Sequence, residues 1–251
     1  MPHLLLIFIA AVFLLAGFVK GVIGLGLPTV SMGLLAVAMA PAHALAIVIV
    51  PAILTNIWQT FAGPYFLAIV KRLWPLLLGL VVGIWLNADM MTGPYARYGT
   101  VLIGVLLVIY AIIGLRRVSI TVRPRDEKWI GGIIGLVTGV ISAATGVQVV
   151  PSMPFMQALG MKKDELIQAL GVFFTAATLA QALNLSAAGI LDESVAVPGV
   201  IALAASFTGM ATGQAIRTRL EPEAFRHWFL IAMILLGIYL AVVASYEIHF
   251  A

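Results

Sequence analysis

The sequence predicts an all-α polytopic membrane protein made of two inverted repeats, each a re-entrant helical hairpin followed by three transmembrane helices. Composition is the first observation: 63% of the 251 residues are hydrophobic and 10% are charged, with a mean hydropathy of +1.13. Soluble domains carry about 25% charged residues. The second observation is a series of apolar runs that can cross a hydrocarbon core of about 30 Å. The third is an internal repeat.

Eight apolar segments have the length and hydropathy of membrane-crossing helices. They lie at about 4–17, 44–63, 73–88, 99–115, 129–145, 166–187, 195–216 and 227–246. Two further apolar stretches, 27–40 and 147–160, are too short to cross, because each extends only about 20 Å at 1.5 Å rise per residue. We expect each to be the second arm of a hairpin that enters the membrane part of the way and returns, with short helices beginning at Leu27 and Val147.

The distribution of positive charge predicts which loops face the cytoplasm, because cytoplasmic loops of membrane proteins are rich in lysine and arginine. Under the hairpin layout, every lysine and arginine except Lys20 and Arg97 falls on one side. That side includes 116–128, which we expect to be a basic cytoplasmic linker, and both termini then lie outside. Treating each hairpin arm as a full span gives the same sides, so only the arm lengths favour hairpins.

The two halves of the chain, 1–115 and 129–251, look like copies of one unit. Because three crossings follow each hairpin, the second copy is inserted upside down relative to the first. Secondary transporters use such inverted repeats and hold their substrate near the midplane, where broken helices of both halves meet. The matches are Gly17 with Gly139, Gly24 with Gly146, Asn56 with Thr178 and Gln59 with Gln181 at a shift of 122, and Gly79 with Gly209 and Gly83 with Gly213 at a shift of 130.

A single positive charge interrupts the first hairpin, in the stretch GFVKGVIGLGLP at residues 17–28. A lysine at the bilayer centre costs about 2.5–3.5 kcal/mol, so Lys20 is a candidate functional residue. No acidic residue lies in the neighbouring apolar segments, and an anionic substrate would supply the missing charge. The alternative is that Lys20 lies nearer the outer interface and extends its amine to water.

Glycines and prolines interrupt helix formation at both hairpin tips, and non-helical backbone at that depth is tolerated where it lines a cavity. The candidate residues are Gly24 and Gly26 at the first tip, and Gly146 with its neighbours Thr145 and Gln148 at the second. The N-terminal amides of the short helices would carry partial positive charge, which suits an anion.

Neutral polar side chains recur on the spans that follow the hairpins. Such side chains hydrogen-bond oxyanions without adding charge, and we expect four of them to orient the substrate. The alternative is that they only join helices, at about 0.6–2 kcal/mol each. The four are Asn56, Gln59, Thr178 and Gln181, with Thr55 and Thr175 beside them.

Other classes of site find no support in the sequence. The chain has no cysteine and four widely separated histidines, so we expect no metal site. A nucleophile paired with a base and a P-loop pattern are also absent, so we expect no enzymatic activity, no cofactor and no ATP-driven transport. The sequence pI is 9.6, but membrane orientation explains the basic loops better than nucleic-acid binding does. Asp164 and Glu165 are candidates for proton coupling, although acids often simply begin a helix.

The doubled tip pattern resembles the TauE/SafE sulfite exporter family. It reads GFVKGVIGLG followed by Pro28 in the first half and GVISAATGVQVVP in the second, and VPAILTNIWQ adds to the likeness, which extends over nearly the whole chain. In the second copy Ala143, Ala144 and Gln148 stand where more glycine is usual. The glycine-rich motif of the family maps onto Gly17, Gly21, Gly24 and Gly26, and its second-half counterpart onto Gly139 and Gly146.

The resemblance implies a secondary transporter of a small anion, sulfite or an organosulfonate, in the bacterial cytoplasmic (inner) membrane. We expect alternating access, with the substrate at the midplane between the two repeats and the lipid bilayer as surroundings. A coupling proton and a homodimer are left open as further partners. The alternatives are an anion channel and a carrier of non-sulfur organic anions such as carboxylates.

Overall fold

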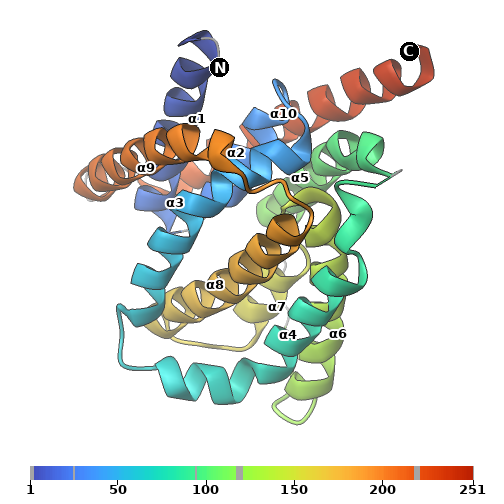
Figure 1. Cartoon of the computed structure of the whole chain (residues 1–251). Coiled ribbons are helices and arrows are strands. Elements are labelled where there is room, and N and C mark those ends of the chain that lie inside the picture. The colour runs from blue at the N-terminus through green and yellow to red at the C-terminus, as the bar shows by residue number, and fades with distance from the viewer. Residues whose placement is uncertain (1–2, 25, 94, 117–120, 218–220, 251) are drawn as a thin grey trace.

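The computed structural model describes residues 3–24, 26–93, 95–116, 121–217 and 221–250, which form helices joined by short connections (Figure 1). Within these ranges there is no β-strand, so the all-α class is confirmed. Part of the evidence for orientation lies outside the described residues, namely Arg117, Arg219 and the side chain of Arg97.

Eight helices of the described chain are long and apolar enough to cross a membrane, which confirms a multi-pass membrane protein. One short helix follows the first helix of each half, and three single turns of 3-10 helix lie in the connections of the described chain. The long helices are α1 (His3–Ile23), α3 (Pro41–Phe61), α4 (Phe66–Leu86), α5 (Gly99–Arg116), α6 (Glu127–Thr145), α8 (Lys163–Ala187), α9 (Ala196–Ile216) and α10 (Pro222–Phe250). The shorter elements are α2 (Leu27–Leu35), α7 (Ser152–Ala158), η1 (Ala88–Met90), η2 (Ala96–Tyr98) and η3 (Glu193–Val195).

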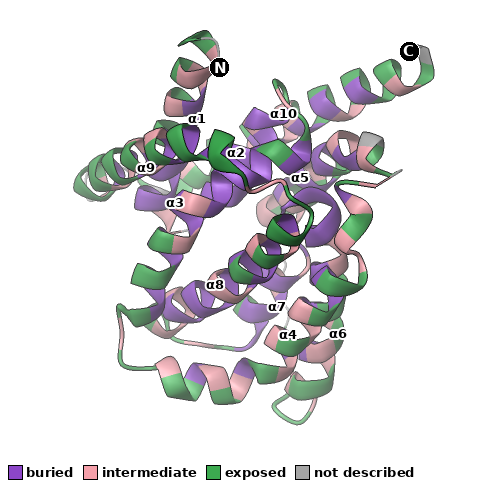
Figure 2. Ribbon diagram, viewed as in Figure 1, coloured by how far each residue is buried: buried purple, intermediate pink, exposed green. Residues whose placement is uncertain are grey.

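The outward faces of the long helices expose large apolar side chains, as a surface in contact with lipid requires. All five tryptophans are exposed, together with long aliphatic side chains such as Leu4, Leu67 and Leu86. Figure 2 shows the buried residues gathered at the centre of the bundle and the exposed ones along the outer faces. The long helices therefore bury apolar side chains between them and also present apolar side chains outward.

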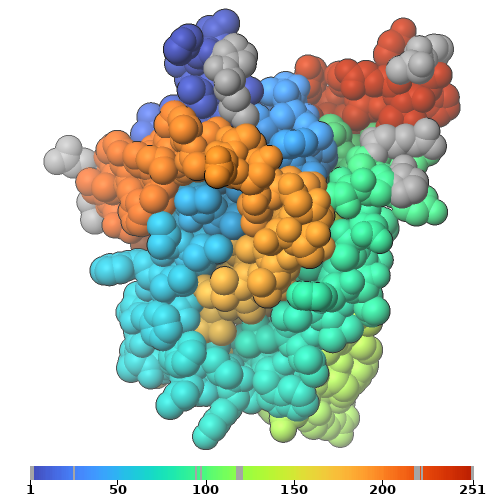
Figure 3. All heavy atoms as spheres, in the orientation of Figure 1, coloured from blue at the N-terminus to red at the C-terminus, as the bar shows by residue number. Residues whose placement is uncertain are grey.

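Four helix pairs form the framework: α1 with α9, α4 with α6, α3 with α8, and α5 with α10. Of the eight long helices, α3 and α8 are the most buried, and α8 also packs against α4, as the space-filling view shows (Figure 3). Glycines let all four pairs touch at the backbone, which is typical of membrane helix pairs. A methyl group on Gly17 would overlap the carbonyl of Ser206, and one on Gly139 would overlap that of Leu80.

The two hairpin tips differ in the structure. At the first tip α1 ends at Ile23, the chain turns through Gly24 and Gly26 with positive φ angles of 82° and 105°, and α2 begins at Leu27 as expected. Such angles favour glycine, because a side chain with a Cβ rarely adopts them.

At the second tip the expected helix start at Val147 is wrong, because residues 147–149 are not helical and α7 begins at Ser152. Pro151 explains the difference: in a helix that began at Val147 it would lack a needed N–H and clash with the preceding turn. The chain therefore runs non-helically from Gly146 to Pro151. The partial membrane depth of both hairpins stays a prediction.

Candidate functional site

The amine of Lys20 lies in the interior of the protein, between α1 and α3. Its Nζ donates hydrogen bonds to Oδ1 of Asn56 at 2.7 Å and to Oγ1 of Thr55 at 3.0 Å. Only 7% of the Lys20 surface is exposed, so the amine does not reach bulk water. Among the described residues no carboxylate forms an ion pair with it. The Lys20 amine is thus buried, with two neutral acceptors around it.

A chain of hydrogen bonds continues from Lys20 into the second half of the protein. Nδ2 of Asn56 is 3.5 Å from Oγ1 of Thr178, and this hydroxyl donates to the carbonyl oxygen of Phe174 at 2.6 Å. All of these side chains are buried. The structure therefore brings together three of the expected site residues, Lys20, Asn56 and Thr178, where α1, α3 and α8 meet.

Gln59 and Gln181, which the sequence shift of 122 pairs, each donate hydrogen bonds to a neighbouring helix. Nε2 of Gln59 donates to the carbonyl oxygen of Ile167 at 2.8 Å. Nε2 of Gln181 donates to the carbonyl oxygen and to Oγ of Ser142, at 2.7 and 2.6 Å. These donors are in use within the protein. For the two glutamine amides, the structure supports the alternative that they join helices.

Near the second tip, Thr145 and Gln148 also have structural surroundings. Oγ1 of Thr145 donates to the carbonyl oxygen of Ile141 and accepts from the N–H of Val147, so it completes the end of α6. The Oε1 atoms of Gln148 and Gln181 are buried without a hydrogen-bond partner. An oxygen acceptor repels an anion, so these amides would serve an oxyanion only after rotating to present their N–H groups.

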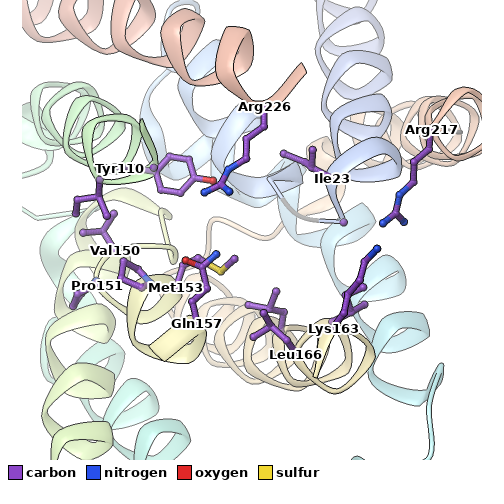
Figure 4. Close-up of a pocket in the computed structure, with 16 residues that line it drawn as sticks. Ile23, Tyr110, Val150, Pro151, Met153, Gln157, Lys163, Leu166, Arg217 and Arg226 are labelled. Carbon is purple, nitrogen blue, oxygen red and sulfur yellow. The ribbon is translucent and has the colours of Figure 1, made fainter. Parts of the chain in front are cut away.

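A cavity of about 560 Å³ opens beside the first tip (Figure 4). Its wall combines the first tip, the non-helical segment of the second tip and the ends of α5, α8, α9 and α10 that meet there. Gly24 belongs to this wall, and its N–H donates to the carbonyl oxygen of Lys20 at 2.8 Å. The backbone of Lys20 therefore lies one helical turn before Gly24 in α1. The polar lining residues are Tyr110, Gln157, Lys163, Arg217 and Arg226.

Among known protein families, the one described as sulfite exporter TauE/SafE matches residues 9–240 of this chain. The chain belongs to the TauE/SafE sulfite exporter family. No curated protein and no solved structure matches it. TauE/SafE is a family of membrane transporters, so membership assigns this protein to membrane transport and confirms the resemblance seen in the tip motifs.

The two tips of this TauE/SafE protein differ in how tightly they are packed. A Cβ atom on Gly146 would lie 3.0 Å from Cε of Met32 and 3.2 Å from Cδ1 of Leu45. A Cβ atom on Gly24 would meet nothing within 4 Å. The repeat shift of 122 pairs Met32 with Pro154 and Leu45 with Ile167, both of which line the cavity. The second tip is therefore packed tightly against Met32 and Leu45, whereas the space beside Gly24 is open.

Sequence reasoning missed several polar groups that this TauE/SafE protein uses. Gln168 joins α8 to the end of α3: its Nε2 donates to the carbonyl oxygens of Thr60 and Gly63, and its Oε1 accepts from the N–H of Tyr65. A glutamine within an apolar segment was the available signal. No local signal pointed to the cations of the cavity, because Lys163, Arg217 and Arg226 come from three separate helix ends.

Proposed function

We propose that this TauE/SafE protein carries a small anion, sulfite or an organosulfonate, through a site at Lys20. The observation that carries the proposal is a buried amine with no carboxylate partner among the described residues. A buried charge without a counter-charge is costly in protein and in membrane. An anionic substrate supplies that counter-charge, and the family is described as one of sulfite exporters.

The hydrogen bonds around Lys20 leave capacity for an oxyanion. An ammonium group has three N–H donors, and Thr55 and Asn56 accept two of them. The third is available to a substrate oxygen. The bond from Nδ2 of Asn56 to Thr178 is long at 3.5 Å, and bonds of that length are weak. Nδ2 can therefore donate to a substrate oxygen instead at little cost, while Oδ1 keeps its bond from Lys20.

The pairing of helices supports two inverted halves. If α1–α5 correspond to α6–α10, the pair α1–α9 corresponds to α6–α4, and the pairs α3–α8 and α5–α10 correspond to themselves. A two-fold axis in the membrane plane produces this pattern. Asn56 and Thr178, which are 122 positions apart, are in contact, as equivalent residues near such an axis would be.

Alternating access follows from the unequal packing of the tips. Contacts around Gly146 close one path to the centre, while the equivalent positions around Gly24 are open to the cavity. Since the cavity lies at the basic end of the bundle, the positive-inside rule makes this the inward-open state. Closing Ile167 toward Gly24 and releasing Leu45 from Gly146 would give the outward-open state, as in other inverted-repeat transporters.

The substrate is tested by flux into liposomes that contain the purified protein. The panel is sulfite, thiosulfate, sulfonates and carboxylates at two pH values, with Lys20→Ala beside the wild type. We expect flux of a sulfur oxyanion or sulfonate in the wild type and none above background in Lys20→Ala. Lys71→Ala, which removes an exposed lysine, is the matched control and should transport normally. Normal flux in Lys20→Ala would reject the site.

The mechanism is tested with single cysteines, since the chain has none of its own. Ile167→Cys and Leu45→Cys occupy equivalent positions, one lining the cavity and the other 2% exposed. Without substrate, a membrane-impermeant maleimide should label only Ile167→Cys, from the basic side. A transported anion should lower the rate of labelling of Ile167→Cys and raise the labelling of Leu45→Cys from the opposite side. Labelling of both from both sides, independent of substrate, would indicate a channel instead.

A further inference from the structure

The cavity beside the first tip carries an excess of positive charge. Lys163 is in the first turn of α8, Arg217 follows the end of α9, and Arg226 is near the start of α10. No acidic side chain stands among the described residues that line the cavity. Membrane orientation explains why these cations lie at this end of the bundle, but it does not explain why they face one hollow.

Lys163 and Arg217 differ from Arg226 in their surroundings. Figure 4 shows the Lys163 amine and the Arg217 guanidinium pointing toward one another at one side of the cavity. Neither has an ion-pair partner within the described chain. Two like charges that face each other repel, and an anion between them turns the repulsion into attraction. Arg226 points toward the Tyr110 hydroxyl instead and also lines an adjoining hollow that contains Glu223.

The rest of the cavity is larger and more apolar than an inorganic oxyanion needs. Its volume of about 560 Å³ falls in the range of pockets that hold small organic ligands. Sulfite has four heavy atoms and fills a small fraction of that space. Across the cavity from Lys163 and Arg217, the wall contains Val150 and Met153, and Leu166 lies beside Lys163 on α8.

We propose that Lys163 and Arg217 form a second anion site in this cavity, where they hold the head group of an organic anion whose apolar body lies along Val150, Met153 and Leu166. The inference rests on the proposed function, because the cavity leads to Gly24 and hence to the turn that bears Lys20. The cavity site collects the substrate, and its apolar wall favours sulfonates or carboxylates with a hydrocarbon body over inorganic anions.

The test compares benzenesulfonate with methanesulfonate, which share a head group and differ in the apolar body. Binding is measured by calorimetry on the purified chain in lipid nanodiscs at about 0.15 M ionic strength. We expect benzenesulfonate to bind about 10-fold or more tightly than methanesulfonate, from the apolar surface that it buries. The double variant Lys163→Gln/Arg217→Gln should lose about 10-fold or more of its affinity for benzenesulfonate, because two charge-assisted contacts are removed.

A double variant of equal charge change is the control. Lys128→Gln/Lys71→Gln removes two exposed lysines that do not line the cavity, and its affinity should stay within about 2-fold of wild type, because exposed distant charges are screened. Leu166→Asn should reduce the preference for benzenesulfonate over methanesulfonate. An equal loss of benzenesulfonate affinity in both double variants would overturn the cavity site. So would an unchanged affinity in Lys163→Gln/Arg217→Gln.

Lys20→Ala separates this inference from the proposed function. It should abolish flux and leave benzenesulfonate bound at the cavity. If Lys20→Ala loses that binding as completely as Lys163→Gln/Arg217→Gln does, there is one site and the inference is overturned. If Lys20→Ala transports normally while Lys163→Gln/Arg217→Gln binds weakly, the role of Lys20 is wrong and the cavity site stands.

Discussion

Replacing Lys20 with methionine should abolish transport and leave a protein that still folds. The substitution keeps a long side chain in place and removes the buried charge. It also removes the bonds to Asn56 and Thr55, and two bonds from a charged donor contribute about 3–6 kcal/mol together. Against this loss, a lysine deep in the membrane costs about 2.5–3.5 kcal/mol, which the variant no longer bears. The net effect should therefore lie between about 0.5 kcal/mol of stabilisation and about 3.5 kcal/mol of destabilisation.

Two measurements on the same preparation check this. Thermal unfolding followed by tryptophan fluorescence gives stability, and anion flux into liposomes gives function. Lys20→Met should fold, with a loss of stability of no more than about 3.5 kcal/mol, and transport at background level, whereas Lys71→Met, at an exposed position, should match wild type in both. A Lys20→Met protein that transports like wild type would refute the reasoning. So would one that fails to fold, since the amine would then be chiefly a structural group.

Three further substitutions test the framework that positions the site. Arg72→Met removes the bidentate pair in which Arg72 bonds to Glu127 at 2.6 and 2.9 Å; thermal unfolding should show a loss of about 1–3 kcal/mol, and an unchanged melting temperature would contradict it. Gly79→Ala places a methyl group against the carbonyl of Gly132 and should lower the yield of monodisperse protein. Gly132→Ala is the control and should be tolerated, because its Cβ would meet nothing closer than 3.9 Å. Gln168→Leu leaves three backbone groups without their partner and should lower stability by about 1–3 kcal/mol in the same unfolding assay; equal stability would show that water replaces the amide.

Much of the helix layout could be predicted from the sequence, because a long apolar run is typical of a transmembrane helix and of few other structures. The eight long helices fall on the eight apolar segments, and α2 begins at Leu27 as expected. The start of α7 could not be read in the same way. A short apolar run fits a helix and a non-helical segment equally well. In this chain Pro151 prevents a helix over residues 147–151, and α7 begins at Ser152.

The site was readable in part, because polar groups in an apolar chain are few. Lys20, Asn56 and Thr178 stood out by residue type, and the structure joins them. The role of Gln59 and Gln181 as helix-joining groups depends on which carbonyl lies opposite each amide, and no sequence pattern encodes that. The cavity is likewise invisible in the sequence, because its wall comes from helix ends that are distant along the chain.

Calorimetric titration of sulfite into wild-type protein and into Lys20→Gln and Lys20→Arg is the most direct test of an anion at Lys20. Truncating one partner of a buried charge pair typically costs 2–5 kcal/mol, so Lys20→Gln should bind sulfite at least about 30-fold more weakly than wild type. Lys20→Arg keeps the charge and should recover part of the affinity. Equal sulfite affinity in wild type and Lys20→Gln would contradict an anion site at this lysine.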